Sequence, residues 1–150
     1  MSNTPTHSIE IGAASKADLE HIERLLSACK LPVEGVSELV DSFLVARADG
    51  KLAGLAAIER CGAYGLLRSV AVEPVARSEG VGRALVDRLI ADAREKRVPA
   101  LYLLTTTAEK YFTSFGFRTI DRTEVPNEIQ STSEFRDLCP SSATVMRLSL

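Results

Sequence analysis

Apolar residues near the start of the chain recur at the spacing of a helix. They lie three or four residues apart: Leu19, Ile22, Leu25, Leu26 and Cys29. This period predicts a helix over about residues 16–29 with one buried face, which Leu31-Pro32 ends. A short strand with Ile9 and Ile11 facing inward is expected before the helix, and a shorter helical piece over residues 35–41 after it.

Three apolar runs separated by turn residues predict consecutive strands. Residues 43–46 and 52–58 flank Asp49-Gly50, a dipeptide that favours the positive φ angles of a tight hairpin turn. A third apolar run covers residues 66–72, and Pro74 follows it and ends the predicted strand. Strands joined by such short turns form an antiparallel meander.

The period becomes helical again from Gly82 and remains so until Pro99. Residues 101–104 are apolar throughout, as in a fully buried strand, and the order strand, helix, strand implies a parallel crossover. A short helix over residues 108–115 stopped by Gly116, a helical turn over 134–138 and a closing strand over 144–148 are expected next. The pattern therefore predicts a mixed α+β sheet with two main helices.

The composition is that of a globular domain. The 150 residues are 45% hydrophobic and 25% charged, and no run approaches the ~18 apolar residues of a membrane span. We expect a flexible tail over residues 1–7, a single domain over 8–150 and no membrane partner. A net charge of −2 gives no positive field for a phosphate backbone, so nucleic acid is not an expected partner. The start MSNTPTHSIE has no basic segment followed by an apolar one, so a cytoplasmic protein is expected.

The cysteines suggest no metal chemistry. Cys29, Cys61 and Cys139 are odd in number and far apart, which fits neither a disulfide framework nor a Cys-x-x-Cys motif. We interpret them as small buried or half-buried apolar residues and expect no metal.

The candidate chemistry lies between the third strand and the second long helix, in Arg77-Ser78-Glu79-Gly80-Val81-Gly82. Two glycines allow the backbone to approach a ligand, and the start of the helix offers N–H groups to an anion such as a pyrophosphate. A Walker A loop needs a Lys after the glycines, and a dinucleotide fingerprint needs a third Gly; neither pattern is present. A glycine-rich connection without a ligand remains the alternative.

The surrounding residues narrow this choice. The loop is preceded by Val70-Ala71-Val72-Glu73-Pro74. The helix opens with Arg77-x-x-Gly80-x-Gly82-x-Ala84-Leu85, and the buried strand is followed by Ala108-x-x-Tyr111-Phe112-x-x-x-Gly116-Phe117. In order and spacing these segments resemble the acetyl-CoA-binding core of the GNAT superfamily of N-acetyltransferases. The resemblance implies an α+β fold: a mostly antiparallel sheet of about six or seven strands with a parallel β-α-β core and helices on both faces.

Further segments resemble one subgroup. Within the superfamily the chain is most similar to the arsenic-resistance N-acetyltransferases and more distantly to the acetyltransferase domain of N-acetylglutamate synthase. The segments behind this likeness are Leu31-Pro32 with Gly35, residues 43–46, residues 66–69, residues 101–109 and residues 125–140.

The resemblance assigns the acetyl-CoA contacts residue by residue. Backbone groups of Val70, Ala71 and Val72 would pair with the pantetheine arm in the manner of an added strand. The pyrophosphate would lie on the loop and helix start, formed by Arg77, Ser78, Glu79, Gly80, Val81, Gly82, Arg83 and Ala84. Thr106, Tyr111 and Phe112 would line the other side of the arm, although the aromatic pair has the spacing of a simple core as well.

Proposed catalytic groups follow from the needs of acetyl transfer. The N–H of Val70 is the natural donor to the oxyanion, and Glu73 and Glu59 are the nearest acidic candidates for the base. Glu73 is equally plausible as a surface residue, and His21 on the polar side of its helix is not expected to be a base. Many GNAT enzymes place a Tyr acid where this chain has Phe112; Tyr111 is one step, or about 100°, away on a helix, so solvent is an alternative acid.

An amino-acid-like substrate needs a cation for its carboxylate. Arg68 shares a strand face with Leu66 and Val70 in the predicted alternation, so it binds either the substrate or an internal acidic partner. Arg47 is a weaker candidate. By resemblance, Pro32 and Ser69 would also contact the substrate.

The expected function is acetyl-CoA-dependent acetylation of a small, amino-acid-like amine in arsenic resistance or toxin detoxification, and a homodimer is one expected assembly. One alternative is an acyl-CoA-binding sensor without catalysis, suggested by Phe112 at the usual Tyr position. Another is binding of trivalent arsenic by the cysteines, whose spacing gives no local chelate.

Overall fold

The computed structural model describes residues 9–77, 80–132, 135–136 and 143–150. The chain forms two compact units. The first unit comprises Met1–Ala57 and Ser69–Arg88, and the second comprises Ile58–Arg68 and Leu89–Leu150. The expected tail over residues 1–7 lies outside the described residues.

Within the described residues, seven strands form one sheet in the order β1-β2-β3-β4-β5-β7-β6. Their bounds are β1 Ile9–Ala13, β2 Phe43–Ala48, β3 Lys51–Cys61, β4 Tyr64–Val72, β5 Ala100–Thr105, β6 Arg118–Ile120 and β7 Thr144–Ser149. The pairs β1–β2, β2–β3, β5–β7 and β6–β7 are antiparallel, whereas β4 and β5 are parallel. The predicted mixed sheet with a parallel crossover is confirmed; β6 was not expected, because its three residues carry no apolar run.

The helices agree with the predicted periods in part. Their bounds are η1 Lys16–Asp18, α1 Leu19–Ala28, η2 Ser37–Ser42, η3 Pro74–Ala76, α2 Val81–Glu95, α3 Glu109–Thr113, η4 Arg122–Glu124 and α4 Asn127–Gln130, where η marks a 3-10 helix. The α3 helix is shorter than predicted, and α4 was not expected. The turn predicted over residues 134–138 lies largely outside the described residues.

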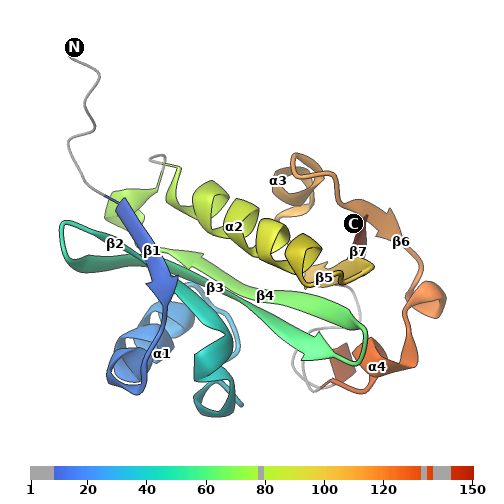
Figure 1. Cartoon of the computed structure of the whole chain (residues 1–150), viewed down its shortest axis with the longest axis horizontal. Coiled ribbons are helices and arrows are strands. Elements are labelled where there is room, and N and C mark those ends of the chain that lie inside the picture. Colours follow the sequence, from blue (N-terminus) through green and yellow to red (C-terminus); the bar gives the residue numbers. More distant parts are fainter. Residues whose placement is uncertain (1–8, 78–79, 133–134, 137–142) are drawn as a thin grey trace. The chain divides into compact units, whose positions relative to one another are not determined.

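The core of the first unit forms where α1 packs on the first strands (Figure 1). Ile22, Leu25 and Leu26 on α1 are buried in one cluster with Phe43 of β2 and Leu55 of β3. The prediction that Ile9 faces inward is wrong, since Ile9 at the first position of β1 is 36% exposed, whereas Ile11 is half-buried.

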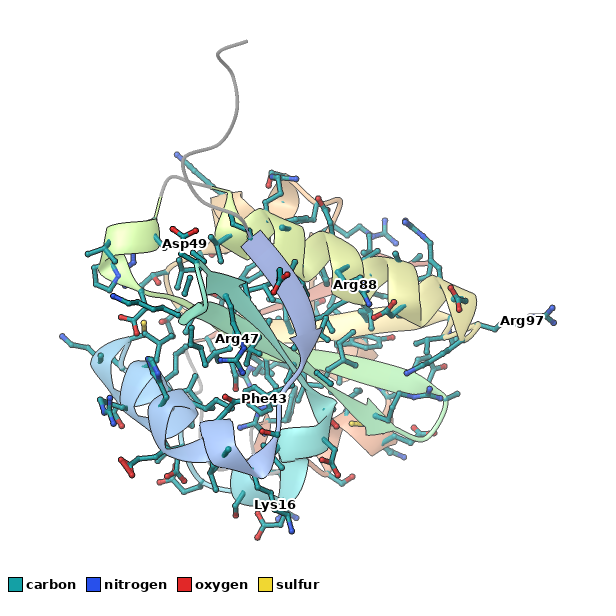
Figure 2. All side chains as sticks on the ribbon, turned by 60° about the vertical axis from the view of Figure 1, so that its left-hand side comes forward. Lys16, Phe43, Arg47, Asp49, Arg88 and Arg97 are labelled. Carbon is teal, nitrogen blue, oxygen red and sulfur yellow. The ribbon has the colours of Figure 1, made fainter. Side chains whose placement is uncertain are left out.

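The turn between β2 and β3 has the predicted geometry. Asp49 and Gly50 have φ angles of 53° and 82°, both in the left-handed region that this dipeptide tolerates. Figure 2 shows Asp49 at the tip of this hairpin, away from Phe43 at its base.

A glycine on β3 lets α2 approach the sheet of the first unit. A Cβ atom added to Gly54 would lie 2.8 Å from Cγ1 of Val81 and 3.1 Å from the carbonyl oxygen of Ala71. Both distances are below ordinary contact, so no side chain fits there. Gly54 thus fixes how closely the first turn of α2 packs on β3 and β4.

The second unit has its own apolar cluster. Leu66 of β4, Tyr102 of β5, Ile129 of α4 and Val145 of β7 are buried in it. The ring of Tyr102 lies 5.8 Å from that of Tyr64 in an edge-to-face arrangement. Parallel pairing places Gly65 opposite Leu101 and Leu66 opposite Tyr102, so β4 and β5 pair near the start of each strand.

Candidate functional site

The last residues of β4, in the first unit, lie beyond the pairs that β4 forms with β5, which involve Gly65 and Leu66. The N–H of Glu73 donates to the carbonyl of Ala53 on β3 at 2.8 Å. Backbone groups of successive strand residues point to opposite sides, so those of Val70 and Val72 point away from β3. These are the residues predicted to hold the pantetheine arm and the oxyanion, and their orientation fits an added hydrogen-bonding partner.

The loop after β4 leads into the positive end of α2. Gly80 has a φ of +79°, which disfavours a residue with a side chain, and its carbonyl accepts the first helical bond from the N–H of Ala84 at 3.0 Å. The N–H groups of Val81 and Gly82 lie in the turn before that bond, where a helix attracts anions. Ser78 and Glu79, which were predicted to join this site, lie outside the described residues.

The charged residues of this loop differ in position. Arg77 is exposed, and its Nε–H donates to the carbonyl of Val72 at 3.2 Å. Its Nη2 lies 3.6 Å from Sγ of Cys29, just after α1. Arg83 and Ala84 lie in the first turn of α2, where Arg83 is exposed and Ala84 is half-buried. The predicted loop residues Arg77, Gly80 and Val81 to Ala84 therefore occur together at one end of α2.

Glu73, the proposed base, has a partner that the sequence did not indicate. Its Oε2 lies 3.0 Å from Nε2 of His21, and both side chains are partly exposed. The two residues are 52 positions apart, so no local pattern pairs them. His21 thus contacts a candidate catalytic carboxylate, which its place on the polar side of α1 did not predict.

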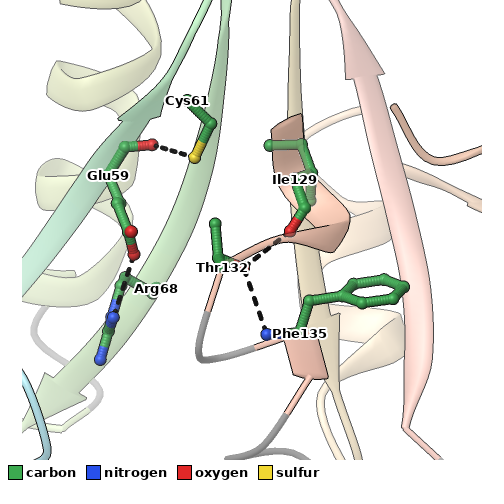
Figure 3. A network of polar contacts seen from close by, with 6 residues as sticks. All are labelled: Glu59, Cys61, Arg68, Ile129, Thr132 and Phe135. Atoms are coloured by element: carbon green, nitrogen blue, oxygen red, sulfur yellow. Dashed lines mark hydrogen bonds and ion pairs between the residues drawn. The ribbon is translucent and has the colours of Figure 1, made fainter. Parts of the chain in front are cut away.

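Arg68 in the second unit forms the internal ion pair that was one of its two predicted roles. Its Nη1 donates to Oε1 of Glu59 at 3.1 Å, and the Arg68 side chain is only 2% exposed (Figure 3). Burial of a guanidinium is unfavourable without an anionic partner, and Glu59 on β3 supplies it. Glu59 is therefore held by a cation, which weakens its case as a free base.

The backbone changes at the next residue. Ser69 has a φ of 62°, and both Arg68 and Ser69 are buried. Strict alternation would bury only one of two neighbours, and a left-handed residue within a strand is typical of a bulge. The prediction that Arg68 shares a face with Val70 assumed an alternation that does not continue through Ser69.

The segment after α4 adds a polar group to this part of the second unit. Thr132 is buried, donates from Oγ1 to the carbonyl of Ile129 at 2.7 Å and accepts from the N–H of Phe135 at 3.2 Å (Figure 3). The sequence did not indicate that Thr132 is buried and hydrogen-bonded, because a single threonine in a polar segment matches no motif or hydrophobic period.

Cys61 in the same unit donates from Sγ to the carbonyl of Glu59 at 3.3 Å, and burial raises the pKa of its thiol to about 11. A neutral thiol is a weak nucleophile, so Cys61 is structural.

The aromatic residues of α3 also lie in the second unit and point in two directions. Phe112 is 8% exposed and its ring lies 6.0 Å from that of Phe117 in the core, whereas Tyr111 is 39% exposed. The predicted difference in direction between Tyr111 and Phe112 is thus confirmed. Thr106 is exposed just after β5, and Oγ1 of Thr105 accepts the N–H of Ala108 at 3.0 Å. The predicted threonine cap is wrong for α3 itself, because its N-cap residue is Ala108, which makes no side-chain cap bond.

The remaining substrate candidates lie in the first unit. Pro32 is half-buried between Leu31 and Val33, which pack on the apolar cluster of that unit. Arg47 donates from Nη2 to Oδ1 of Asp18 at 2.7 Å. This contact lowers the pKa of Asp18, and it engages Arg47 in the fold.

Two kinds of feature are absent from the described residues. No helix there combines the length and apolarity needed to cross a membrane. Nor does that part of the chain hold a group of three or more His, Cys, Asp or Glu side chains arranged to bind a metal ion.

Comparison with known proteins identifies relatives of this arrangement. Residues 40–119 match a family described as Acetyltransferase (GNAT) domain. An amino-acid acetyltransferase of Mycobacterium tuberculosis is 34% identical over 108 residues, which cover 69% of this chain and 59% of that protein. The chain therefore spans about six-tenths of the length of this relative.

Solved structures share the fold. N-acetylglutamate synthase from Neisseria gonorrhoeae, complexed with coenzyme A and L-arginine, superposes with a TM-score of 0.80 and 25% identity over 95% of this chain and 33% of that one. A Mycobacterium tuberculosis protein in complex with CoA has a TM-score of 0.80 and 27% identity, covering 94% of this chain and 99% of that one.

Proposed function

Because the chain belongs to the acetyltransferase (GNAT) family, we propose that it transfers the acetyl group of acetyl-CoA to the amine of a small, amino-acid-like substrate. The observation that carries this proposal is the direction of the β4 backbone: the groups of Val70 and Val72 point away from β3, since the N–H of Glu73 bonds to Ala53 at 2.8 Å. An extended ligand with amide groups fits such an edge.

The same end of the first unit suits the phosphates of acetyl-CoA. The positive φ of Gly80 starts α2 without a side chain at its tip, and the N–H groups of Val81 and Gly82 lie at the positive end of the helix. Arg77 and Arg83 supply cations in the same loop and turn. We assign the pyrophosphate to these residues.

The chemistry requires three tasks of the chain. Glu73 accepts the proton that the substrate nitrogen loses as the nitrogen bonds to the thioester carbonyl carbon. The N–H of Val70 donates to the carbonyl oxygen as negative charge develops there. When the bond from carbon to sulfur breaks, the departing thiolate takes a proton from Tyr111 or from water. His21, 3.0 Å from Glu73, orients that carboxylate.

The amine substrate is assigned to the side chains around Arg68. The Arg68 guanidinium is already paired with Glu59 and only 2% exposed, so a substrate carboxylate would have to share this cation with Glu59. Ser69 and Pro32 remain predicted contacts. The relatives named amino-acid acetyltransferases support an amino acid as the substrate class. The predicted likeness to arsenic-resistance enzymes is the reason to include phosphorus- and arsenic-containing amino-acid analogues among the candidate substrates.

One assay tests the function. Release of free thiol from acetyl-CoA is followed with a panel of amino acids and their phosphorus- and arsenic-containing analogues. We expect turnover with at least one amine, and Gly80→Val should abolish coenzyme A binding while the far-UV circular dichroism stays unchanged. Gly12→Ala is the matched control, because a Cβ atom at Gly12 meets nothing within 4 Å. Unchanged binding by the Gly80 variant would remove the phosphate assignment.

An acyl-CoA sensor is the second candidate. It is favoured by Phe112, which is buried at the position where many relatives are expected to carry a catalytic tyrosine. Saturable coenzyme A binding without turnover on any amine would support the sensor and contradict the transferase.

A further inference from the structure

We propose that Arg77 is a switch that makes the pantetheine edge of β4 available only when a pyrophosphate is bound. The inference rests on the proposed function, because it takes acetyl-CoA as the ligand. It adds a coupling between two parts of the site that the proposed function treats as independent.

The contacts of Arg77 place its side chain on the edge itself. Its Nε–H donates to the carbonyl oxygen of Val72 at 3.2 Å, and this carbonyl points away from β3 toward the side assigned to the pantetheine arm. An arginine side chain that bonds there covers the same backbone group that an added strand would use. Arg77 therefore competes with pantetheine for Val72.

The second contact of Arg77 is weak. Its Nη2 lies 3.6 Å from Sγ of Cys29, and a thiol sulfur is a poor acceptor. The bond to Val72 has one ionised partner, whereas in a bond from the guanidinium to a phosphate oxygen both partners are ionised and the contact can be bidentate. Since Arg77 is exposed and only three residues before Gly80, a phosphate at the start of α2 offers it better partners than Val72 and Cys29 do.

The exchange has a definite direction. When a pyrophosphate engages Arg77, the guanidinium leaves the carbonyl of Val72, and the carbonyl can accept a hydrogen bond from the pantetheine arm. Pantetheine alone must displace Arg77 without compensation. Pyrophosphate and pantetheine therefore bind with positive cooperativity, although they contact different residues.

Fragments of the cofactor test this coupling on the full chain. Pantetheine, kept reduced, and ADP are titrated separately and together by isothermal titration calorimetry. In the wild type, saturating ADP should tighten pantetheine binding about threefold to tenfold, which is the range for one hydrogen bond. In Arg77→Met, pantetheine alone should bind as tightly as it binds to the wild type with ADP, and ADP should add nothing further, whereas whole coenzyme A binds more weakly.

Two controls make the result specific. Arg88→Met removes the same charge from α2 at an exposed position and should keep the wild-type coupling. Arg77→Lys keeps a cation for the phosphates but lacks Nε–H, so coenzyme A binding should persist while the coupling falls. If Arg77→Met leaves pantetheine affinity unchanged, or if ADP tightens pantetheine equally in the variant, the switch is overturned. The proposed function survives that outcome; it fails instead if wild-type protein binds no coenzyme A.

Discussion

The two compact units hold their candidate functional groups in different ways. In the first unit these groups are mostly backbone: the N–H of Val70, the carbonyl of Val72 and the helix start after Gly80. In the second unit they are side chains, among them the ion pair of Arg68, whose side chain is 2% exposed, with Glu59. Backbone groups are placed by local conformation, whereas this ion pair depends on a contact across two strands. The first kind of site leaves a pattern of glycines in the sequence; the second leaves almost none.

The largest expected effect tests the buried pair of the second unit. Glu59→Gln removes the anion that faces Arg68, whose side chain is 2% exposed. Breaking a buried pair leaves an uncompensated charge, so we expect the free energy of unfolding to fall by about 3 kcal/mol in urea denaturation. Glu95→Gln, at an exposed residue, is the control and should change little. If Glu59→Gln is as stable as the wild type, the second unit does not depend on this contact.

The next effect tests the packing that positions the helix start of the first unit. Gly54→Ala would place a Cβ atom 2.8 Å from Val81 and 3.1 Å from the backbone of Ala71, and overpacking of this kind costs about 1–3 kcal/mol. Coenzyme A affinity should fall with stability, because Val81 opens α2. Gly12→Ala is again the matched control for both measurements. Normal affinity in Gly54→Ala would show that the helix start is placed by other contacts.

A smaller effect concerns the half-exposed pair of the first unit. The hydrogen bond from Arg47 holds the pKa of Asp18 below its ordinary value of 3.8. A lowered pKa in the folded state stabilises the protein above about pH 4, and this contribution is lost as the pH falls through the lowered value. Asp18→Asn should therefore cost about 0.5–1 kcal/mol at pH 7, and this cost should shrink as the pH falls below about 4, measured by urea denaturation across pH. Glu20→Gln, which removes an exposed pair with Arg24, is the control and should change the free energy of unfolding little at pH 7.

The smallest expected effect is a difference in alkylation rate between two cysteines, which reports the burial of Cys61 in the second unit. With a pKa of about 11, roughly one in a thousand Cys61 thiols is ionised at pH 8. Iodoacetamide should therefore modify Cys61 far more slowly than the half-buried Cys29, as judged by peptide mass spectrometry. In guanidinium chloride the two rates should converge. Equal rates in the folded protein would mean that Cys61 is accessible.

The sequence allowed most elements and the family to be predicted. Helical spacing on α1 and the Asp49-Gly50 turn are local signals, and the structure confirms both. The likeness to GNAT acetyltransferases rested on Arg77 to Gly82 and the flanking segments, and the family match confirms it. The closeness to the arsenic-resistance enzymes, the site residues and the single-domain organisation stay predictions.

What the sequence could not provide depends on contacts between distant residues. His21 and Glu73 are 52 positions apart, and their contact needs the placement of α1 against the end of β4. Ser69 adopts a left-handed backbone that serine rarely favours, so its position is set by the strand around it rather than by its own preference. The α4 helix is too short for a period to be recognised.

The tight packing at Gly54 has a consequence for how this protein tolerates mutation. Gly54 contacts Val81 at the first turn of α2, although it belongs to a strand and to no binding loop. In a library selected for coenzyme A capture, substitutions at Gly54 should be depleted together with those at Gly80. The positions depleted in such a library would therefore include residues that support the phosphate loop by packing, as well as the residues of the loop itself.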